Sequence, residues 1–287
     1  MFDPERGGGL LALAVHRGGQ WIDLAPDGRL PENGMRQASW LMLPYSNRIR
    51  DGRFVFGGRT HQLANGGSHA IHGDVRRRPW EMVERGPDRL RLRFDSAAYP
   101  DFNWPWPIEA TVEIRLEGDA FVQSLSVMNR GTTPMPLGFG WHPYYRRWLT
   151  RDGEPVLLGF TATRVHPDAN HDGLPDGPPV PVPAELDFSV PRRLDERLID
   201  SCFAGFAGRA TIEWPESGVR LRYACSPNVT HLVCYAPTDR PVFAVEPAAN
   251  ANDGVNRLAA GERDHGVLVL EPGDGLEATF RTTAEVR

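Results

Sequence analysis

Cysteine is scarce in this sequence, and the few cysteines form no recognisable metal or redox motif. There are three, Cys202, Cys225 and Cys234, and none belongs to a CxxC pair. An odd number without that spacing argues against a disulfide framework and is typical of a reducing compartment. We therefore do not expect disulfides to hold this protein together.

Membrane-length apolar runs and an excess of positive charge are also missing. No apolar run approaches the ~20 residues that a membrane-spanning helix needs. The N-terminal stretch MFDPERGGGLLALAVH lacks the basic region of a signal peptide. The net charge is −5 at pH 7, and the basic residues form no extended stripe, which argues against a nucleic-acid partner. The sequence thus predicts a cytoplasmic protein with no membrane or nucleic-acid partner, and it does not indicate an oligomeric state.

Helical periodicity is nearly absent, whereas the alternation typical of β-strands is frequent. The best candidate for a short helix is residues 193–199. Apolar and polar residues alternate with a period of two, which predicts strands, at residues 90–94, 111–116 and 121–127. Further strands are predicted at residues 53–56, 211–214, 219–223, 231–235, 242–245, 267–270 and 276–281. Glu117-Gly118-Asp119 is typical of a hairpin turn.

Many short strands, few helices and no internal repeat predict an all-β protein, a large antiparallel β-sandwich. Residues 165–190 are rich in proline and glycine and could form a linker. Strand patterns continue on both sides of them without a change in composition. We therefore predict a long surface loop inside a single domain that spans residues 1–287.

The stretch GFGWHPYYRRW places a histidine before a proline among aromatic residues. Pro143 has a fixed φ and no N–H, so it stiffens the backbone just after His142. A rigid histidine in an aromatic setting suits a ligand-facing role, but it also suits a core histidine, and the pattern leaves both open. His72 lies in GGSHAIHGD, a glycine-rich turn whose backbone can approach a ligand closely.

Three charged residues are further candidates for a site. Glu246 ends the apolar run VFAV and precedes Pro247. Burial there would raise its pKa toward the neutral range that suits a general base, although a strand-end glutamate can equally face water. Asp200, in LIDSCF, could bind a hydroxyl-rich ligand or cap a turn. Arg48, in PYSNRIRDGRF, could bind hydroxyls or carboxylates, or could form a surface ion pair.

Metal and cofactor motifs are incomplete or missing. His69 and His72 form an HxxH pair without further zinc ligands at a standard spacing. DANHDG, from Asp168, matches the start of a calcium loop, but its twelfth position is Pro179. The sequence has no GxSxG, phosphate loop or dinucleotide fingerprint. We expect neither a metal nor an organic cofactor, and calcium binding by residues 168–179 stays open.

Taken together, six segments in order resemble the aldose 1-epimerases, a family of galactose mutarotase-like proteins. They are PYSNRIRDGRFVFGG, HAIHGDVRRRPW, VMNRGTTPMPLGFGWHPYY, LIDSCF, FAVEPAANANDGVN and LAAGERDHGVLVLEPG. The resemblance extends from about Pro44 to the C-terminus. It implies a twisted β-sandwich, the galactose mutarotase-like supersandwich, with an open cleft for a small-molecule sugar.

The resemblance also implies a role for each candidate residue. Glu246 would be the catalytic base and His142 the acid. His72 would bind the sugar and stabilise charge, Asp200 would hold sugar hydroxyls, and Arg48 would bind the sugar or support the site. The reaction would interconvert the α and β anomers of a free aldose. One group would remove the proton of the C1 hydroxyl, and a group on the opposite side would protonate the ring oxygen.

The substrate and even the catalytic nature of the protein have alternatives. The motif usually written HLHGG is AIHGD here, and AANANDG follows the Glu-Pro pair; we expect both departures to lie at the rim of the cleft and to affect the choice of sugar. A neutral hexose is favoured, but the arginine clusters 76–78 and 146–147 could select an anionic sugar such as a hexose 6-phosphate or a sulfonated sugar. The other alternative is a non-catalytic carbohydrate-binding protein. Some buried aromatic residue could stack on the sugar, although core packing is favoured for the candidates Phe139, Trp141 and Trp104.

Overall fold

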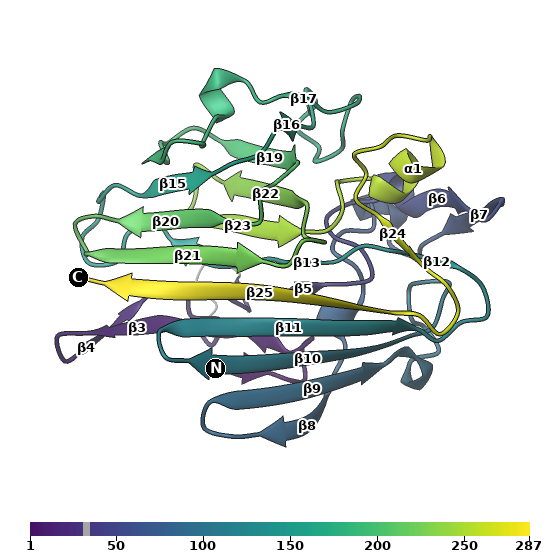
Figure 1. The fold of residues 1–287 in the computed structure, drawn as a ribbon, viewed down its shortest axis with the longest axis horizontal. Helices are drawn as coiled ribbons and strands as arrows, with labels where there is room; N and C mark the ends of the chain where they lie inside the picture. The colour runs from purple at the N-terminus through teal and green to yellow at the C-terminus, as the bar shows by residue number, and fades with distance from the viewer. Residues whose placement is uncertain (31–34) are drawn as a thin grey trace.

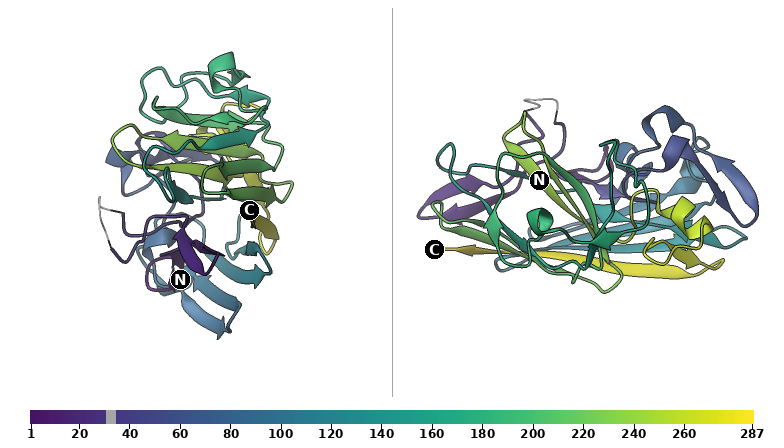
Figure 2. Two further views of the ribbon diagram at one scale, coloured as in Figure 1. Left: turned by 90° about the vertical axis from the view of Figure 1, so that its left-hand side faces the viewer. Right: turned by 90° about the horizontal axis from the view of Figure 1, so that it is seen from above.

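The computed structural model describes residues 1–30 and 35–287. Two large antiparallel sheets face each other and form a sandwich (Figures 1 and 2). The larger sheet has nine strands in the described residues. In spatial order they are β18 (Arg192–Arg193), β15 (Leu157–Phe160), β20 (Ala210–Trp214), β21 (Val219–Cys225), β25 (Gly275–Val286), β11 (Ala120–Asn129), β10 (Ile108–Glu117), β9 (Arg89–Asp95) and β8 (Glu81–Arg85). The long β25 crosses the middle of this sheet, yellow in Figure 1.

The second large sheet carries the residues that matter for function. Its strands, in spatial order, are β17 (Val180–Pro181), β16 (Arg164–Val165), β19 (Ile199–Ala204), β22 (His231–Ala236), β23 (Val242–Ala248), β13 (Gly140–Trp141) and β5 (Leu41–Met42), and β14 (Tyr144–Arg146) also pairs with β23. We call it the site sheet.

Short elements surround the two sheets. The strand pairs are β1 (Phe2–Asp3) with β2 (Gly9–Leu10), β3 (Ala14–Arg17) with β4 (Gln20–Asp23), β6 (Arg53–Phe56) with β7 (Arg59–Gln62), and β12 (Met135–Leu137) with β24 (Leu268–Leu270). The 3-10 turns are η2 (Arg50–Gly52), η3 (Gly66–Ser68), η4 (Val75–Arg77), η5 (Ser96–Ala98) and η6 (Ala184–Leu186). The described residues contain one α-helix, α1 (Gly254–Ala259), beside β6 and β7 in Figure 1. Within the described part of the chain, no helix has the length and apolar character to cross a membrane.

The core lies between the sheets because alternate side chains of each strand point inward. Trp141 of the site sheet lies 5.6 Å from Phe280 of β25, measured between ring centroids. The Tyr223 hydroxyl of β21 lies 2.7 Å from the Tyr145 hydroxyl and donates to the Val245 carbonyl at 3.2 Å. One face of the site sheet therefore packs in the core, and only the other face can carry a binding or catalytic site.

The predicted all-β class is confirmed, and each predicted strand corresponds to an observed one. The turn after Glu117 joins β10 to β11 with Gly118 at φ 60°, as the pattern indicated. The prediction of a helix at residues 193–199 was wrong, because those residues begin in β18 and end in β19. The segment 165–190 contains β16, β17 and η6, so it is less irregular than its composition suggested.

Candidate active site

His142 and Glu246 are brought together by strand register. The ladder between β13 and β23 pairs Gly140 with Ala248, and the ladder between β14 and β23 pairs Tyr144 with Ala244. Both pairings follow one register, which places His142 opposite Glu246 at the break between them. The His142 Nε2 atom lies 3.2 Å from the Glu246 Oε1 atom.

The residues that lie beside His142 and Glu246 on the neighbouring segments extend this pair into a row across the site sheet. The His142 amide donates to the Trp40 carbonyl at 3.0 Å, and Glu246 pairs with Val233 of β22. The next row, two residues away on each strand and therefore on the same face, joins Tyr144, Ala244, Tyr235 and Asp200. Asp200, predicted from LIDSCF, thus lies on the same face of the sheet as the His142–Glu246 pair.

His72 and Arg48 reach this face of the sheet from loops that are joined by hydrogen bonds between their backbones. The His72 amide donates to the Asn47 carbonyl at 2.7 Å, and the Asp74 amide donates to the Leu43 carbonyl at 3.0 Å. His72 itself has φ 64°, an uncommon conformation for a residue with a side chain. The loop is therefore held in a conformation that the isolated sequence would not favour.

The segment AANANDG, which follows the Glu-Pro pair, forms hydrogen bonds to the loop that contains Arg48. The Asn250 Oδ1 atom accepts a hydrogen bond from the Ser46 amide at 3.0 Å, and the Asp253 Oδ1 atom accepts one from the Arg50 amide at 2.9 Å. The Asp253 amide donates to the Arg48 carbonyl at 2.7 Å. The residues of AANANDG thus support the loop; among them, Asn252 reaches the cavity wall indirectly, through its hydrogen bond to the Gly173 carbonyl at 2.7 Å.

All five predicted site residues line one cavity of about 210 Å³. Its lining consists of Asn47, Arg48, Ile71, His72, His142, Tyr144, Gly173, Asp200, Val233, Tyr235 and Glu246. The acid and base candidates were expected on opposite sides of the sugar. They are instead in direct contact on one wall of the cavity.

Burial shifts the protonation of the central pair in opposite directions. Glu246 and His142 are 2% and 4% exposed. Burial, and secondarily the charge of Asp200, raises the pKa of Glu246 well above its usual value. Burial, and secondarily the charge of Arg76, lowers the pKa of His142 to about 3. Both shifts favour the uncharged forms, a carboxylic acid next to a neutral imidazole.

The surrounding ionisable groups follow the same trend. Burial, with the charge of His142 second, lowers the pKa of His72 well below its usual value. Burial also raises the pKa of Asp200, and the nearby Arg48 partly opposes that shift. These shifts favour the neutral imidazole of His72 and His142 in the folded protein.

Several polar atoms of the site have no hydrogen-bond partner among the described residues. They are Glu246 Oε2, His142 Nδ1 and His72 Nδ1, all buried. Buried polar atoms without partners are costly and uncommon in folded proteins. Their concentration around one cavity is the pattern expected where a polar ligand binds.

Comparison with known proteins assigns the chain to a family. The family model described as aldose 1-epimerase matches residues 4–283. This chain belongs to the aldose 1-epimerase family. The match begins well before Pro44, where the resemblance in the sequence began.

Individual relatives agree with the family and with the fold. The uncharacterised protein YphB of Escherichia coli (strain K12) is 26% identical over 293 residues, covering 93% of this chain and 91% of YphB. A galactose mutarotase-like protein from Clostridium acetobutylicum superimposes with a TM-score of 0.82 at 17% identity, over 100% of this chain and 92% of that one. The GalM/aldose epimerase homologue from C. elegans gives a TM-score of 0.78 at 18% identity, over 98% and 94%. The galactose mutarotase-like fold is thereby confirmed.

In this aldose 1-epimerase family member, the aromatic residues at the site are not the ones that the sequence suggested. Phe139, Trp141 and Trp104 are buried in the main core, in agreement with the favoured interpretation. Trp40 stacks on His142 with 4.1 Å between ring centroids, and Tyr144 lies 4.7 Å from the same ring. Trp40 was missed because it lies in a loop outside every predicted strand. The position of Trp40 beside His142 follows from the pairing of β5 with β13, and that pairing cannot be read from the sequence.

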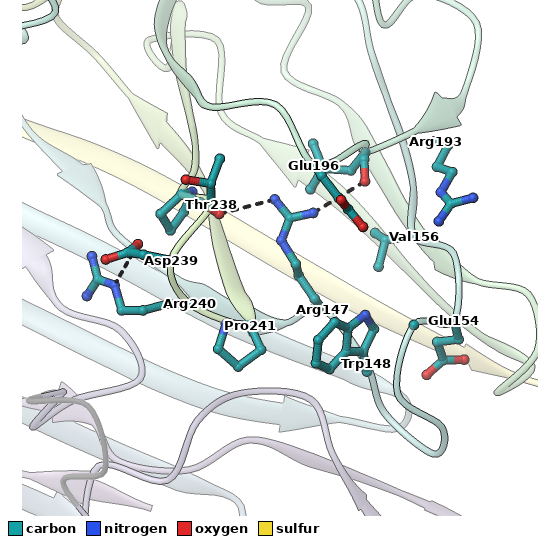
Figure 3. A pocket seen from close by; sticks show the side chains of 13 residues that line it. Arg147, Trp148, Glu154, Val156, Arg193, Glu196, Thr238, Asp239, Arg240 and Pro241 are labelled. Atoms are coloured by element: carbon teal, nitrogen blue, oxygen red, sulfur yellow. Dashed lines mark hydrogen bonds and ion pairs between the residues drawn. The ribbon is translucent and has the colours of Figure 1, made fainter.

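The two arginine clusters have different surroundings. Arg146 is exposed and lies 4.0 Å from Asp23. Figure 3 shows Arg147 in a separate cavity, where it donates to the carbonyls of Asp195 at 3.0 Å and Pro237 at 3.4 Å. Neither lines the candidate active site, so this cluster is not placed to select an anionic sugar there. Arg76 and Arg77, by contrast, line a cavity that adjoins the site.

The departure from the usual HLHGG motif is also explained by packing. Asp74 is buried and binds Arg78, with the Arg78 Nε atom 2.9 Å from Asp74 Oδ2. Asp101 is the second partner of Arg78, at 2.7 Å. The expectation that Asp74 lies at the cleft rim was therefore wrong, and its role here is to fix the turn that follows His72.

The two short metal-like motifs have other uses in this structure. The His69 Nδ1 atom accepts a hydrogen bond from the Asp51 amide at 3.0 Å, whereas His72 lines the active-site cavity. The Asp168 carboxylate accepts from the amides of Asp172 at 3.2 Å and Gly173 at 2.8 Å. Its hydrogen bonds shape the turn that presents Gly173 to the active-site cavity. Among the described residues, no group of three or more His, Cys, Asp or Glu side chains is placed to hold a metal ion.

Proposed function

We propose that this protein is a mutarotase that interconverts the α and β anomers of a free aldose, with Glu246 as the base and His142 as the acid. The observation that carries the proposal is the buried contact of 3.2 Å between His142 and Glu246 in a cavity lined by polar side chains. The two sugar oxygens that exchange protons, the C1 hydroxyl and the ring oxygen, are both bonded to C1. Adjacent acid and base groups therefore suit this reaction.

The steps of the reaction balance without a cofactor. Glu246 removes the proton of the C1 hydroxyl, and a C1=O double bond forms as the bond from C1 to the ring oxygen breaks. His142 delivers a proton to the ring oxygen, which becomes the C5 hydroxyl. Rotation about the C1–C2 bond presents the other face of the aldehyde, and the reverse transfers close the ring. General acid and base catalysis of this kind contributes ~10²–10⁴-fold for each group.

The opposed pKa shifts suit these roles. A carboxylate whose pKa is raised is a stronger base, and an imidazolium whose pKa is lowered is a stronger acid. The neutral pair and the charged pair that starts the reaction contain the same number of protons. They differ only in the position of one proton along the contact between Glu246 and His142. Sugar hydroxyls that enter the cavity would stabilise the charged form by hydrogen bonding.

The remaining cavity residues have roles in binding. Asp200 offers acceptors and Arg48 offers donors for sugar hydroxyls, and His72 lies edge-on to His142 with 4.9 Å between ring centroids. A neutral His72 presents one donor and one acceptor. The three residues come from separate elements, so they can contact different hydroxyls of one ring.

The central test is Glu246→Gln, measured by anomer-exchange NMR with a panel of aldoses. The amide keeps the shape of the side chain but cannot accept the proton, so exchange should fall by ~10³-fold or more, to the spontaneous rate. Asp200→Asn is the control within the same cavity and should raise KM more than it lowers kcat. Catalysed exchange in folded Glu246→Gln protein close to that of the wild type would refute the assignment of the base.

The same experiment separates the enzyme from a non-catalytic carbohydrate-binding protein. A binding protein would bind a sugar in calorimetry while the wild type leaves the spontaneous exchange rate unchanged. That outcome would refute the proposed mutarotase and identify the protein as a carbohydrate-binding protein. The paired His142 and Glu246 favour the enzyme, because sugar binding alone does not require an acid and a base in contact.

A further inference from the structure

A second cavity, of about 510 Å³, adjoins the candidate active site and is unusually basic. We call it the arginine cavity. It is lined by the side chains of five arginines, together with Met35, Gln37, Trp40 and Tyr144. The arginines are Arg6, Arg36, Arg76, Arg77 and Arg240. No aspartate or glutamate is among its lining residues in the described part of the chain.

The two cavities share a wall. Tyr144 lines both of them, and Trp40, which stacks on His142 at 4.1 Å, lines the arginine cavity. Arg240 donates from Nη2 to the hydroxyl of Tyr235 at 3.0 Å, and Tyr235 lines the active-site cavity. The arginine cavity therefore lies directly beside the active-site cavity, with Trp40 and Tyr144 between them.

Arg76 is the residue whose surroundings point most clearly to a ligand. Its neighbour Arg78 is bound by Asp74 and Asp101. Arg76 has no carboxylate within 4.0 Å among the described residues, and its buried Nε atom has no hydrogen-bond partner there. Its guanidinium carbon lies 5.4 Å from the centroid of the Trp40 ring, within the range of a cation–π contact.

The electrostatic state of Arg76 agrees with this geometry. Burial, and secondarily the charge of Arg77, lowers the pKa of Arg76 to about 10, so the side chain stays charged at neutral pH. A partly buried cation without an anionic partner is costly for stability. A bound anion would offset that cost, and a guanidinium can donate two parallel hydrogen bonds to a phosphate or carboxylate.

The proposed reaction indicates which end of the sugar would enter the arginine cavity. If His142 protonates the ring oxygen, then C5 is one bond away from that oxygen, and C6 extends from C5. His142 is also the residue that stacks on Trp40 at the shared wall. The C6 end would therefore lie beside the arginine cavity, while Asp200 and Arg48 remain for the ring hydroxyls.

We propose that the arginine cavity binds an anionic group at C6 of the aldose, with Arg76 and Arg77 as its principal ligands. This inference rests on the proposed function for the orientation of the sugar. A phosphate ester and a C6 carboxylate share the chemistry that the arginines would recognise. A sugar 1-phosphate is excluded as a substrate because mutarotation requires a free C1 hydroxyl.

The test compares kcat/KM for glucose, glucose 6-phosphate and glucuronate by anomer-exchange NMR. The wild type should prefer at least one charged sugar by about tenfold or more, since hydrogen bonds to charged groups are stronger than those between neutral groups. Which charged sugar is preferred distinguishes a phosphate site from a carboxylate site. The preference should weaken between about 0.05 and 0.5 M NaCl, because added salt screens the attraction.

Three variants locate the effect. Arg76→Gln should lower the ratio of kcat/KM for the preferred charged sugar to that for glucose by about tenfold, and Arg76→Lys should retain part of that ratio because it keeps the charge. Arg146→Ala is the control, an arginine outside both cavities, and should leave the ratio unchanged. A wild-type enzyme that turns over glucose at least as well as both charged sugars, with a ratio that Arg76→Gln does not change, would overturn the proposal.

A binding measurement separates this proposal from the proposed function. Calorimetry with the Glu246→Gln variant and glucose 6-phosphate or glucuronate needs no turnover. If no sugar is turned over but the anionic sugar binds, and Arg76→Gln in the same background weakens that binding, the arginine cavity stands while the mutarotase assignment fails. If glucose is turned over but no anionic sugar binds, only the arginine-cavity proposal is wrong. If no sugar is turned over and no anionic sugar binds, both proposals are wrong.

Discussion

At the scale of single residues, the candidate active site contains groups that burial makes costly. Glu246 has one carboxylate oxygen beside His142 and another without a partner among the described residues. Its raised pKa means that ionising it in the folded protein is unfavourable. Proteins retain such groups where the chemistry needs them, and perturbed pKa values are concentrated at functional sites.

His142→Asn tests the role of the acid at this scale. A group that acts only as the ring opens contributes to the transition state rather than to substrate binding. We expect kcat to fall by ~10²-fold or more, with a much smaller change in KM. The measurement is the dependence of NMR anomer exchange on sugar concentration. An increase in KM alone would make His142 a binding residue and would move the acid role to His72.

At the scale of elements, the site depends on an interrupted strand. β13 and β14 follow one register against β23, and the interruption between them falls at His142 and Pro143. Proline cannot donate a ladder hydrogen bond, so pairing stops there while the alternation of side chains continues. Trp141 and Tyr145 consequently point into the core, whereas His142 and Tyr144 point into the cavity.

The turn after His72 is a second element whose conformation the site requires. Gly73 has φ 66°, and a Cβ atom there would lie 2.0 Å from the Leu43 carbonyl oxygen. Gly73→Ala should therefore lower the free energy of unfolding by at least ~2 kcal/mol, from the positive φ and the backbone clash together. Chemical denaturation in urea measures this change. Because the clash would displace His72, exchange activity should fall as well.

Gly118→Ala is the matched control for this substitution. Gly118 has φ 60°, but nothing lies within 4 Å of the position that its Cβ would occupy. Only the conformational penalty remains, so the loss should be about 1 kcal/mol. Equal losses for the two variants would show that the approach of Gly73 to Leu43 does not constrain the loop.

At the scale of the whole molecule, buried histidines make stability depend on pH. Burial lowers the pKa of His72, His142, His166 and His231. A histidine that is neutral in the folded state takes up a proton on unfolding, once the pH falls below its unfolded pKa of about 6.5. Stability should therefore be highest above that value and should decline as the pH falls toward the lowered folded pKa values.

His166 allows this effect to be measured outside the proposed catalytic residues. Burial, with the charge of Arg257 second, lowers its pKa to about 3, and both ring nitrogens lack partners among the described residues. Between about pH 7 and pH 5 this residue alone should cost about 2 kcal/mol of stability. In His166→Phe, which keeps an aromatic ring beside His231, urea unfolding should lose correspondingly less stability over that interval. An identical pH dependence in both proteins would contradict the contribution assigned to His166.

Much of the architecture could be predicted from the sequence because it depends on local patterns. Alternation of apolar and polar residues predicted the strands from β9 to β11 and from β20 to β23, since burial of one face requires a period of two. The prediction failed at residues 193–199, where a short charged segment has no periodicity that distinguishes a turn from a strand. The only α-helix of the described residues, α1, was missed because six residues are too few for a helical period to appear.

For the site, the sequence by itself determined which side chains could do chemistry, and the tertiary structure decided which of them meet. His142, Glu246, Asp200, His72 and Arg48 were candidates because of their residue types and neighbours. Their convergence depends on pairing between strands far apart in the chain, which no local pattern encodes. The same holds for Trp40 and for Arg76, since only packing shows that Arg78 is neutralised by two aspartates whereas Arg76 faces a cavity. Burial, which shifts the pKa values of Glu246 and His142, is likewise a property of the assembled sandwich.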